Sequence, residues 1–165
     1  MKKLIAFTLI AFMGVQAFAQ STSLPTTNVK DLKGASVPFN ETITPGKVTM
    51  ISFWATWCVP CKKEIKAIRE HLSDWHNAAD FNYMTVSVDD SRATAMVRSY
   101  ARSQGWDFPA YQDPNSDLKR ALNFQNVPFT VIVGKDGKIA YMHSGFAEGG
   151  EAELFEKIKE LAEQK

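Results

Sequence analysis

The chain has 165 residues, with 19 basic and 18 acidic side chains and only two cysteines. Because the charges nearly cancel, there is no long-range field of the kind that attracts nucleic acid or anionic lipid. The length is enough for one domain with a full hydrophobic core and too short for two comfortable ones. We therefore expect a single domain that binds no nucleic acid and acts as a monomer.

Residues 1–19 have the pattern of a secretory signal peptide. Two lysines follow the initial methionine, residues 4–15 form an apolar run, and an Ala-Phe-Ala tripeptide ends at Ala19, where a signal peptidase would cut. The apolar run is shorter than the roughly 20 residues of a membrane-spanning helix. We expect an exported protein, in a bacterial periplasm, with its domain over residues 20–165; a retained membrane anchor is the less favoured interpretation.

The first predicted elements place the cysteines between a strand and a helix. Residues 28–32 and 36–39 are short β-like segments split by Lys33-Gly34, which is typical of an N-terminal hairpin. Residues 48–53 form a short apolar run, as in a strand that is buried on both faces. A helix is predicted directly after Cys61 because its apolar residues recur at helical spacing. These residues are Ile65, Ile68, Leu72 and Trp75.

The next elements predict a β-α-β unit with parallel strands. Residues 81–88 indicate a second buried strand, and residues 92–104 indicate a helix. The inward residues of this helix are predicted to be Met96, Val97 and Tyr100. Asp89-Asp90, between these two elements, is interpreted as a solvated loop.

The last elements predict a hairpin that is closed by a helix. A short helical segment over 116–122 precedes a β-branched strand at 129–133. The Gly134-Lys135-Asp136-Gly137 turn folds this strand back onto residues 138–143, which predicts an antiparallel pair. A final helix is expected over residues 151–162 because its apolar residues share one stripe.

Cys58 and Cys61 are predicted to be a reactive pair. They lie three residues apart, and so small a loop restrains the unfolded chain too little to act as a structural staple. At a helix start, free backbone N–H groups and the helix dipole stabilise a thiolate, so we expect a lowered pKa at Cys58. Pro60 fits the first helical turn. Cys58 would attack a disulfide and Cys61 would resolve the mixed disulfide, without metal or organic cofactor.

Metal binding is the alternative role for the cysteine pair. A zinc site lacks its second half, because there are no further cysteines and the histidines are distant, and a covalent haem site is excluded because Lys62 follows Cys61. Two thiolates with His143 suit Cu(I) chemically, so a copper chaperone stays open, although His143 is more simply a sheet residue. His71 and His76 are interpreted as surface residues.

The segment from Phe53 to Glu64, FWATWCVPCKKE, resembles the active-site segment of the thioredoxin superfamily, in particular exported bacterial reductases of the TlpA/ResA type. The likeness extends from about Val29 to the C-terminal helix and includes Val127-Pro128 before the late strand. It implies an α/β thioredoxin fold, with a central mixed β-sheet flanked by helices. It also implies an N-terminal β extension and a β-α insertion before the cis-proline strand.

The resemblance assigns roles to residues outside the pair. Pro128 matches the family's cis-proline, which leaves the backbone of Val127 free to hydrogen-bond a substrate. Glu64 matches an acidic residue that tunes proton transfer at the cysteines; the alternative is a solvated glutamate favoured by the helix dipole. Ser52 stands where cytosolic thioredoxins carry a buried aspartate, so Glu64 is the nearest carboxylate that is able to replace that base.

Three aromatic residues near the motif also receive predictions. We expect Trp57 to be an exposed contact platform for substrate and Trp54 to be core packing. Phe129 follows Pro128 where the family often has threonine or serine, and it would make the substrate groove more apolar.

The sequence therefore predicts a thiol–disulfide oxidoreductase, and the Val-Pro spacer favours a reductase of protein disulfides. Its expected partners are protein disulfides and a membrane thiol donor that recharges it. A disulfide isomerase or oxidase, a thiol peroxidase and the Cu(I) chaperone remain as alternatives.

Overall fold

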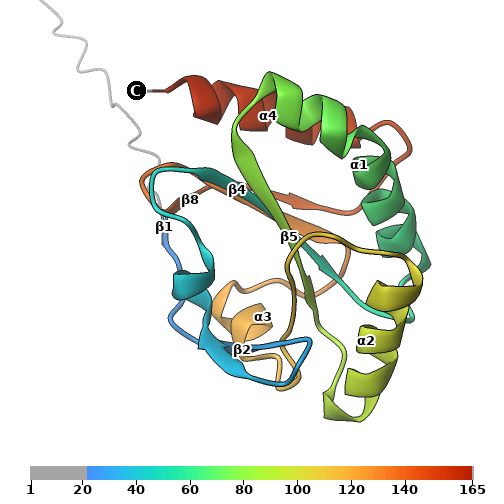
Figure 1. Cartoon of the computed structure of the whole chain (residues 1–165). Helices are drawn as coiled ribbons and strands as arrows, with labels where there is room; N and C mark the ends of the chain where they lie inside the picture. The colour runs from blue at the N-terminus through green and yellow to red at the C-terminus, as the bar shows by residue number, and fades with distance from the viewer. Residues whose placement is uncertain (1–21, 165) are drawn as a thin grey trace, which may run out of the picture.

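The computed structural model describes residues 22–164, so the predicted signal peptide at 1–19 lies outside the described residues. Eight strands form one mixed sheet in the order β1-β8-β7-β4-β5-β6-β2-β3, with helices packed on it (Figure 1). The strands are β1 (Thr22–Ser23), β2 (Asn28–Asp31), β3 (Ser36–Pro38), β4 (Val48–Trp54), β5 (Phe81–Ser87), β6 (Ala110–Gln112), β7 (Phe129–Val133) and β8 (Lys138–Ser144). The predicted α/β thioredoxin fold is confirmed.

Four α-helices and two short 3₁₀ helices connect the strands. They are α1 (Val59–Ala78), α2 (Thr94–Ser103), α3 (Asp117–Ala121), α4 (Glu151–Glu163), η1 (Phe39–Thr42) and η2 (Ser91–Ala93). Within residues 22–164, none of these helices combines the length and the apolar character that a membrane crossing requires.

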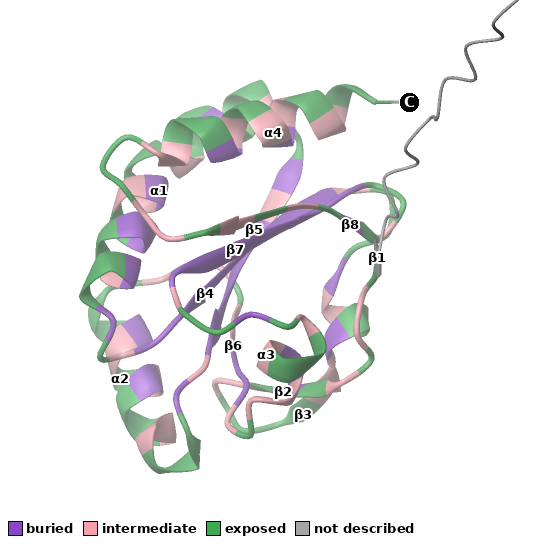
Figure 2. Ribbon diagram, turned by 180° about the vertical axis from the view of Figure 1, so that it is seen from behind, coloured by how far each residue is buried: buried purple, intermediate pink, exposed green. Residues whose placement is uncertain are grey.

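The centre of the sheet is buried on both faces. All residues of β4 and β7 are buried, and Figure 2 shows these strands in purple at the centre of the fold. Strand β4 runs parallel to β5 and antiparallel to β7. Burial on both faces explains why β4 and β7 are largely apolar along their length rather than alternating between apolar and polar residues. The predicted parallel pair and the predicted β7–β8 hairpin are both confirmed.

Alternate residues of β4 supply the hydrophobic clusters on opposite faces of the sheet. Met50 packs with residues of α1 and α4, and Trp54 packs with residues of α1 and α2. Ile51 and Phe53 pack instead with Leu118 of α3 and with residues of the N-terminal segment. Because side chains alternate along a strand, α1, α2 and α4 cover one face and α3 covers the other.

The N-terminal β extension and the β-α insertion are also present. β2 and β3 form the predicted antiparallel hairpin, and β2 also pairs with β6, which follows α2 in the insertion. One prediction about the insertion was wrong, because Met96 is 59% exposed while Val97 and Ala101 are buried. Positions i and i+4 share a helix face, so the stripe through Val97 and Ala101 turns Met96 outward.

Candidate active site

Cys58 and Cys61 lie at the predicted junction between β4 and α1. Cys58 is the residue that precedes the helix, and its Sγ accepts a hydrogen bond from the backbone N–H of Cys61 at 3.3 Å. Pro60 occupies the first helical turn, where an N–H has no helical partner to lose. The two cysteines form a disulfide with their Cα atoms 5.4 Å apart. Both cysteines are buried, Cys58 with 3% of its surface exposed and Cys61 with none.

Apolar side chains surround the surface position of Cys58. Trp57 is 69% exposed and Val59 is 63% exposed. Trp54 is buried instead, with its ring against those of Tyr100 and Trp106 at 5.3 and 4.9 Å between centroids. The prediction of a core role for Trp54 is confirmed, and the exposure of Trp57 is what a contact platform requires.

The segment before β7 lies beside the cysteine pair. The Val127–Pro128 peptide bond is cis, as the resemblance implied. Phe129 pairs with Phe53 near the end of β4, which carries the preceding loop to the cysteine end of the sheet. Val127 packs against the buried cluster that contains both cysteines. Sheet pairing therefore brings Val127, Pro128 and the disulfide together, although about 70 residues separate them in sequence.

The prediction that Phe129 makes the groove more apolar was wrong. Its ring stacks on Phe124 with centroids 4.3 Å apart and lies near Phe53 at 6.0 Å. This cluster packs on the sheet face opposite the one that carries the cysteine cluster. The alternation of side chains along β7 turns the residue after Pro128 away from the disulfide.

Glu64 is buried one helical turn after Cys61, so the alternative interpretation, a solvated glutamate, was wrong. The side chain is 1% exposed, and its Oε1 accepts a hydrogen bond from the Thr130 hydroxyl at 3.5 Å. Among the described residues, its Oε2 has no hydrogen-bond partner. The pKa of Glu64 is raised to about 7: burial raises it most, the Thr130 hydrogen bond lowers it, and the Glu151 carboxylate adds a smaller increase. A carboxyl group with this pKa is able to exchange a proton near neutral pH.

A neutral hydrogen-bonded pair occupies the sheet beneath Glu64. Ser52 is buried, and the Tyr83 hydroxyl donates to its Oγ at 3.2 Å. Burial raises the pKa of Tyr83 well above its ordinary value, so this hydroxyl stays protonated. Ser52 also pairs with Thr130 across β4 and β7. The position that the family comparison assigned to an aspartate therefore holds no charge.

Asp89 was predicted to lie in a solvated loop, and this was wrong. It is 4% exposed, whereas neighbouring Asp90 is exposed as predicted. Its carboxylate accepts hydrogen bonds from the Thr56 N–H at 2.8 Å, the Thr56 hydroxyl at 2.6 Å and the Ser87 hydroxyl at 2.7 Å. Asp89 is thus a buried polar residue next to the cysteine motif. The sequence analysis gave it no role, although a carboxylate that directly follows a buried strand was a signal.

The ligand set considered for copper is not assembled. His143 lies in β8, where it pairs with Thr130. Within residues 22–164, no group of three or more histidine, cysteine, aspartate or glutamate side chains is arranged to hold a metal ion. His71 and His76 are exposed on α1, as predicted.

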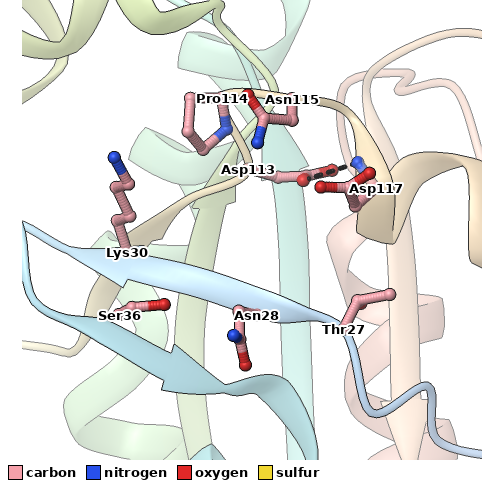
Figure 3. A pocket seen from close by; sticks show the side chains of 8 residues that line it. All are labelled: Thr27, Asn28, Lys30, Ser36, Asp113, Pro114, Asn115 and Asp117. Atoms are coloured by element: carbon pink, nitrogen blue, oxygen red, sulfur yellow. Dashed lines mark hydrogen bonds between the residues drawn. The ribbon is translucent and has the colours of Figure 1, made fainter.

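A polar pocket of about 350 Å³ lies between the N-terminal hairpin and α3 (Figure 3). Asp113 is its buried acidic residue, and its carboxylate accepts hydrogen bonds from the backbone N–H groups of Asp117 and Lys119 at 2.9 and 2.8 Å. These bonds cap the start of α3. Asp113 therefore has a structural explanation, and none of the predicted site residues lines this pocket.

Comparisons with known proteins agree with the fold and with an oxidoreductase function. The sequence model of the AhpC/TSA family matches residues 20–142. The chain is 24% identical to the thiol-disulfide oxidoreductase ResA of Bacillus subtilis over 134 residues, which cover 81% of this chain and 72% of ResA.

Solved structures extend these comparisons. A thioredoxin-like protein from Porphyromonas gingivalis is 40% identical and superposes with a TM-score of 0.75, over 86% of this chain and 94% of its own. StoA from Bacillus subtilis, at 21% identity, shows the same fold with a TM-score of 0.62 over 79% of this chain and 95% of its own. The chain is an oxidoreductase with a thioredoxin-like fold, and it belongs to the AhpC/TSA family.

Proposed function

We propose that this protein reduces disulfide bonds in other proteins through the Cys58–Cys61 pair. The observation that carries the proposal is the placement of the disulfide at the start of α1: Cys58 caps the helix between exposed Trp57 and Val59, whereas Cys61 is fully buried inside the helix. A nucleophile must reach its substrate, whereas a resolving thiol need only reach the nucleophile.

The reaction proceeds by two exchanges of sulfur–sulfur bonds. In the reduced enzyme, the Cys58 thiolate attacks one sulfur of the substrate disulfide, and the other substrate sulfur leaves as a thiolate that takes up a proton. Cys61 then loses its proton and attacks Cys58, which releases the second substrate thiolate. The substrate gains two electrons and two protons, and the enzyme is left with the Cys58–Cys61 disulfide.

Glu64 is proposed to accept the proton of Cys61. It follows Cys61 by one helical turn, it is buried, and its pKa of about 7 lets it take up and release a proton under ordinary conditions. Ser52 and Tyr83 hold no charge at this depth, so Glu64 is the carboxylate that the arrangement offers on α1.

Substrate binding is assigned to the surface around Cys58. Exposed Trp57 would supply apolar contact area, and the backbone of Val127 before Pro128 would hydrogen-bond an extended substrate segment. This mode of binding uses the main chain of the substrate and accepts varied sequences.

The proposed setting is an exported compartment, consistent with the predicted signal peptide, where a membrane thiol donor would return the enzyme to its dithiol form. The chemistry requires no metal and no organic cofactor. Because the Val-Pro spacer keeps the proline of reducing thioredoxins, we expect a reduction potential nearer the roughly −270 mV of thioredoxin than the roughly −120 mV of a strong oxidant.

The test is turnover together with trapping. The purified wild-type protein should accelerate the reduction of insulin disulfides by dithiothreitol, and Cys61→Ser should accumulate a mixed disulfide through Cys58. Cys58→Ser is the matched control and should trap nothing. A protein that consumes peroxide but neither reduces insulin nor traps a substrate would contradict the proposal, as would a potential near that of strong oxidants.

A further inference from the structure

The turn that carries Cys58 is attached to the sheet at two points. At the end of β4, the Trp54 carbonyl accepts a hydrogen bond from the Val88 N–H at 2.8 Å. Two residues further on, Thr56 donates both its N–H and its hydroxyl to the Asp89 carboxylate. The Cys58 N–H bonds to the Ala55 carbonyl at 3.0 Å, which ties the turn to itself rather than to a neighbouring strand.

Asp89 is itself fixed from behind. Its Oδ2 accepts the Ser87 hydroxyl, and the Ser87 Oγ accepts the Asp89 N–H at 3.1 Å. Ser87 is the last residue of β5, and its carbonyl accepts a hydrogen bond from the Asp113 N–H at 2.8 Å. These hydrogen bonds hold the Asp89 carboxylate at the end of the central sheet. Thr56 is held in turn by its two hydrogen bonds to that carboxylate.

We propose that Asp89 is a positioning residue that, through Thr56, fixes the turn presenting Trp57 and Cys58 to the substrate. This inference rests on the proposed function. Neither cysteine sulfur takes part in the contacts between Asp89 and Thr56, so these contacts persist when the disulfide opens. The reduced enzyme loses the Cys58–Cys61 cross-link, and in that state the hydrogen bonds keep the nucleophile at the start of the helix.

The proposal separates hydrogen bonding from charge. In Asp89→Asn, an amide oxygen in the place of Oδ2 still accepts from the Thr56 N–H and the Ser87 hydroxyl, while the amide nitrogen donates to the Thr56 hydroxyl. That variant keeps the geometry and removes the charge. Asp89→Ala removes the geometry as well, and Asp90→Ala removes an exposed neighbouring carboxylate as the matched control.

The experiment measures two rates in each variant. One is kcat/KM for insulin reduction, and the other is the alkylation of Cys58 by iodoacetamide in the reduced protein as a function of pH. Asp89→Ala should lower kcat/KM by about tenfold and move the midpoint of alkylation to higher pH, because the displaced sulfur loses the N–H of Cys61. Asp89→Asn should stay within about twofold of the wild type, and Asp90→Ala should not differ from it.

Two results would overturn the positioning role. One is wild-type rates in Asp89→Ala. The other is an equal loss of kcat/KM in Asp89→Asn and Asp89→Ala, because an equal loss would make the charge of Asp89 the cause. If Asp89→Ala does not fold, Thr56→Val decides the matter, because it loses the hydroxyl bond and keeps the N–H bond. An alkylation profile identical to wild type in Thr56→Val would then overturn the proposal. Alkylation of Cys58 does not require disulfide exchange. A wild-type protein that fails to reduce insulin would therefore contradict the proposed function, while the alkylation profiles would still test the positioning role of Asp89.

Discussion

Two buried carboxylates adjoin the cysteine pair, and their surroundings are opposite. Asp89 lies beside the turn before Cys58 and accepts three hydrogen bonds of 2.6 to 2.8 Å. Glu64 lies one helical turn after Cys61 and accepts one bond of 3.5 Å, while its second oxygen has no partner among the described residues. Both are almost inaccessible to solvent.

The difference in hydrogen bonding indicates different roles for the two carboxyl groups. A carboxylate that is saturated with hydrogen-bond donors is held in place and orients what it touches. A buried carboxyl group that lacks donors has its charged form disfavoured, so its pKa rises into the range where it exchanges protons. We therefore expect Asp89 to set geometry and Glu64 to move protons, and each variant below is a way to break that contrast.

The largest expected effect on stability is that of Asp89→Ala. Two donors of half-buried Thr56 and the buried Ser87 hydroxyl lose their charged acceptor, which should reduce the free energy of unfolding by about 4 kcal/mol. Urea unfolding of the oxidised protein measures the change. Asp90→Ala, at the exposed neighbour, should cause no measurable change, and equal losses in the two variants would contradict the view that Asp89 is a structural anchor.

Glu64→Gln should increase the stability of the protein at alkaline pH, whereas Asp89→Ala reduces it. The pKa of Glu64 is raised from 4.5 to about 7, so between these values the unfolded chain loses its proton while the folded protein keeps it. Wild-type stability should therefore fall as pH rises through this window, by about 3 kcal/mol in total. Glutamine avoids that loss, so the variant should be more stable than the wild type at pH 8 and similar to it at pH 4.

The same variant should slow the resolving step. Loss of a positioned proton acceptor costs about 100-fold in rate, and the step would lose its pH dependence near 7. Release of a trapped substrate from Cys58 by Cys61, followed by stopped flow, measures it. A stable Glu64→Gln protein with wild-type resolution would remove Glu64 from the proton path while leaving its effect on stability in place.

The sequence predicts the position of Glu64 but not the surroundings of Asp89. The position of Glu64 on the first turns of α1 follows from helical spacing after Cys61, and so does its place on the same side as the pair. Its burial depends on Thr130, which the β4–β7 register brings opposite Ser52. Asp89 was misread because Thr56 is 33 residues away in sequence and meets it only when β4 and β5 pair in parallel.

The framework around the site was easier to predict. Strand β4 is largely apolar and α1 has a clear apolar stripe, so the strand-to-helix junction at Cys58 follows from local patterns. Met96 and Phe129 were assigned to the wrong sides because the direction of a side chain on a short element depends on which neighbours cover it. A shift of one residue turns a side chain to the opposite face of a strand, and it rotates a side chain around the axis of a helix.

Thr130→Val should shift the behaviour of Glu64 without removing the carboxyl group. The Thr130 hydroxyl lowers the pKa of Glu64, so its loss should raise that pKa above about 7 and move the pH dependence of the resolving step upward. At pH 8 the variant should be less stable than the wild type by about 1 kcal/mol, and at pH 4, where Glu64 is protonated, the loss should be smaller. An unchanged pH profile would show that the 3.5 Å contact between the Thr130 hydroxyl and Glu64 does not affect the pKa of Glu64.

Tyr83→Phe should reduce stability by no more than Thr130→Val does, and the measurement tests whether that loss depends on pH. The variant loses the hydrogen bond to Ser52, which should reduce the free energy of unfolding by about 1 kcal/mol. Because burial raises the pKa of Tyr83, its hydroxyl is protonated at pH 5 and at pH 8, so the loss should be equal at both. A loss that grows with pH would mean that this hydroxyl stabilises the charged form of Glu64. The neutral pair beneath α1 would then belong to the proton path, and the contrast with Asp89 would be one of degree.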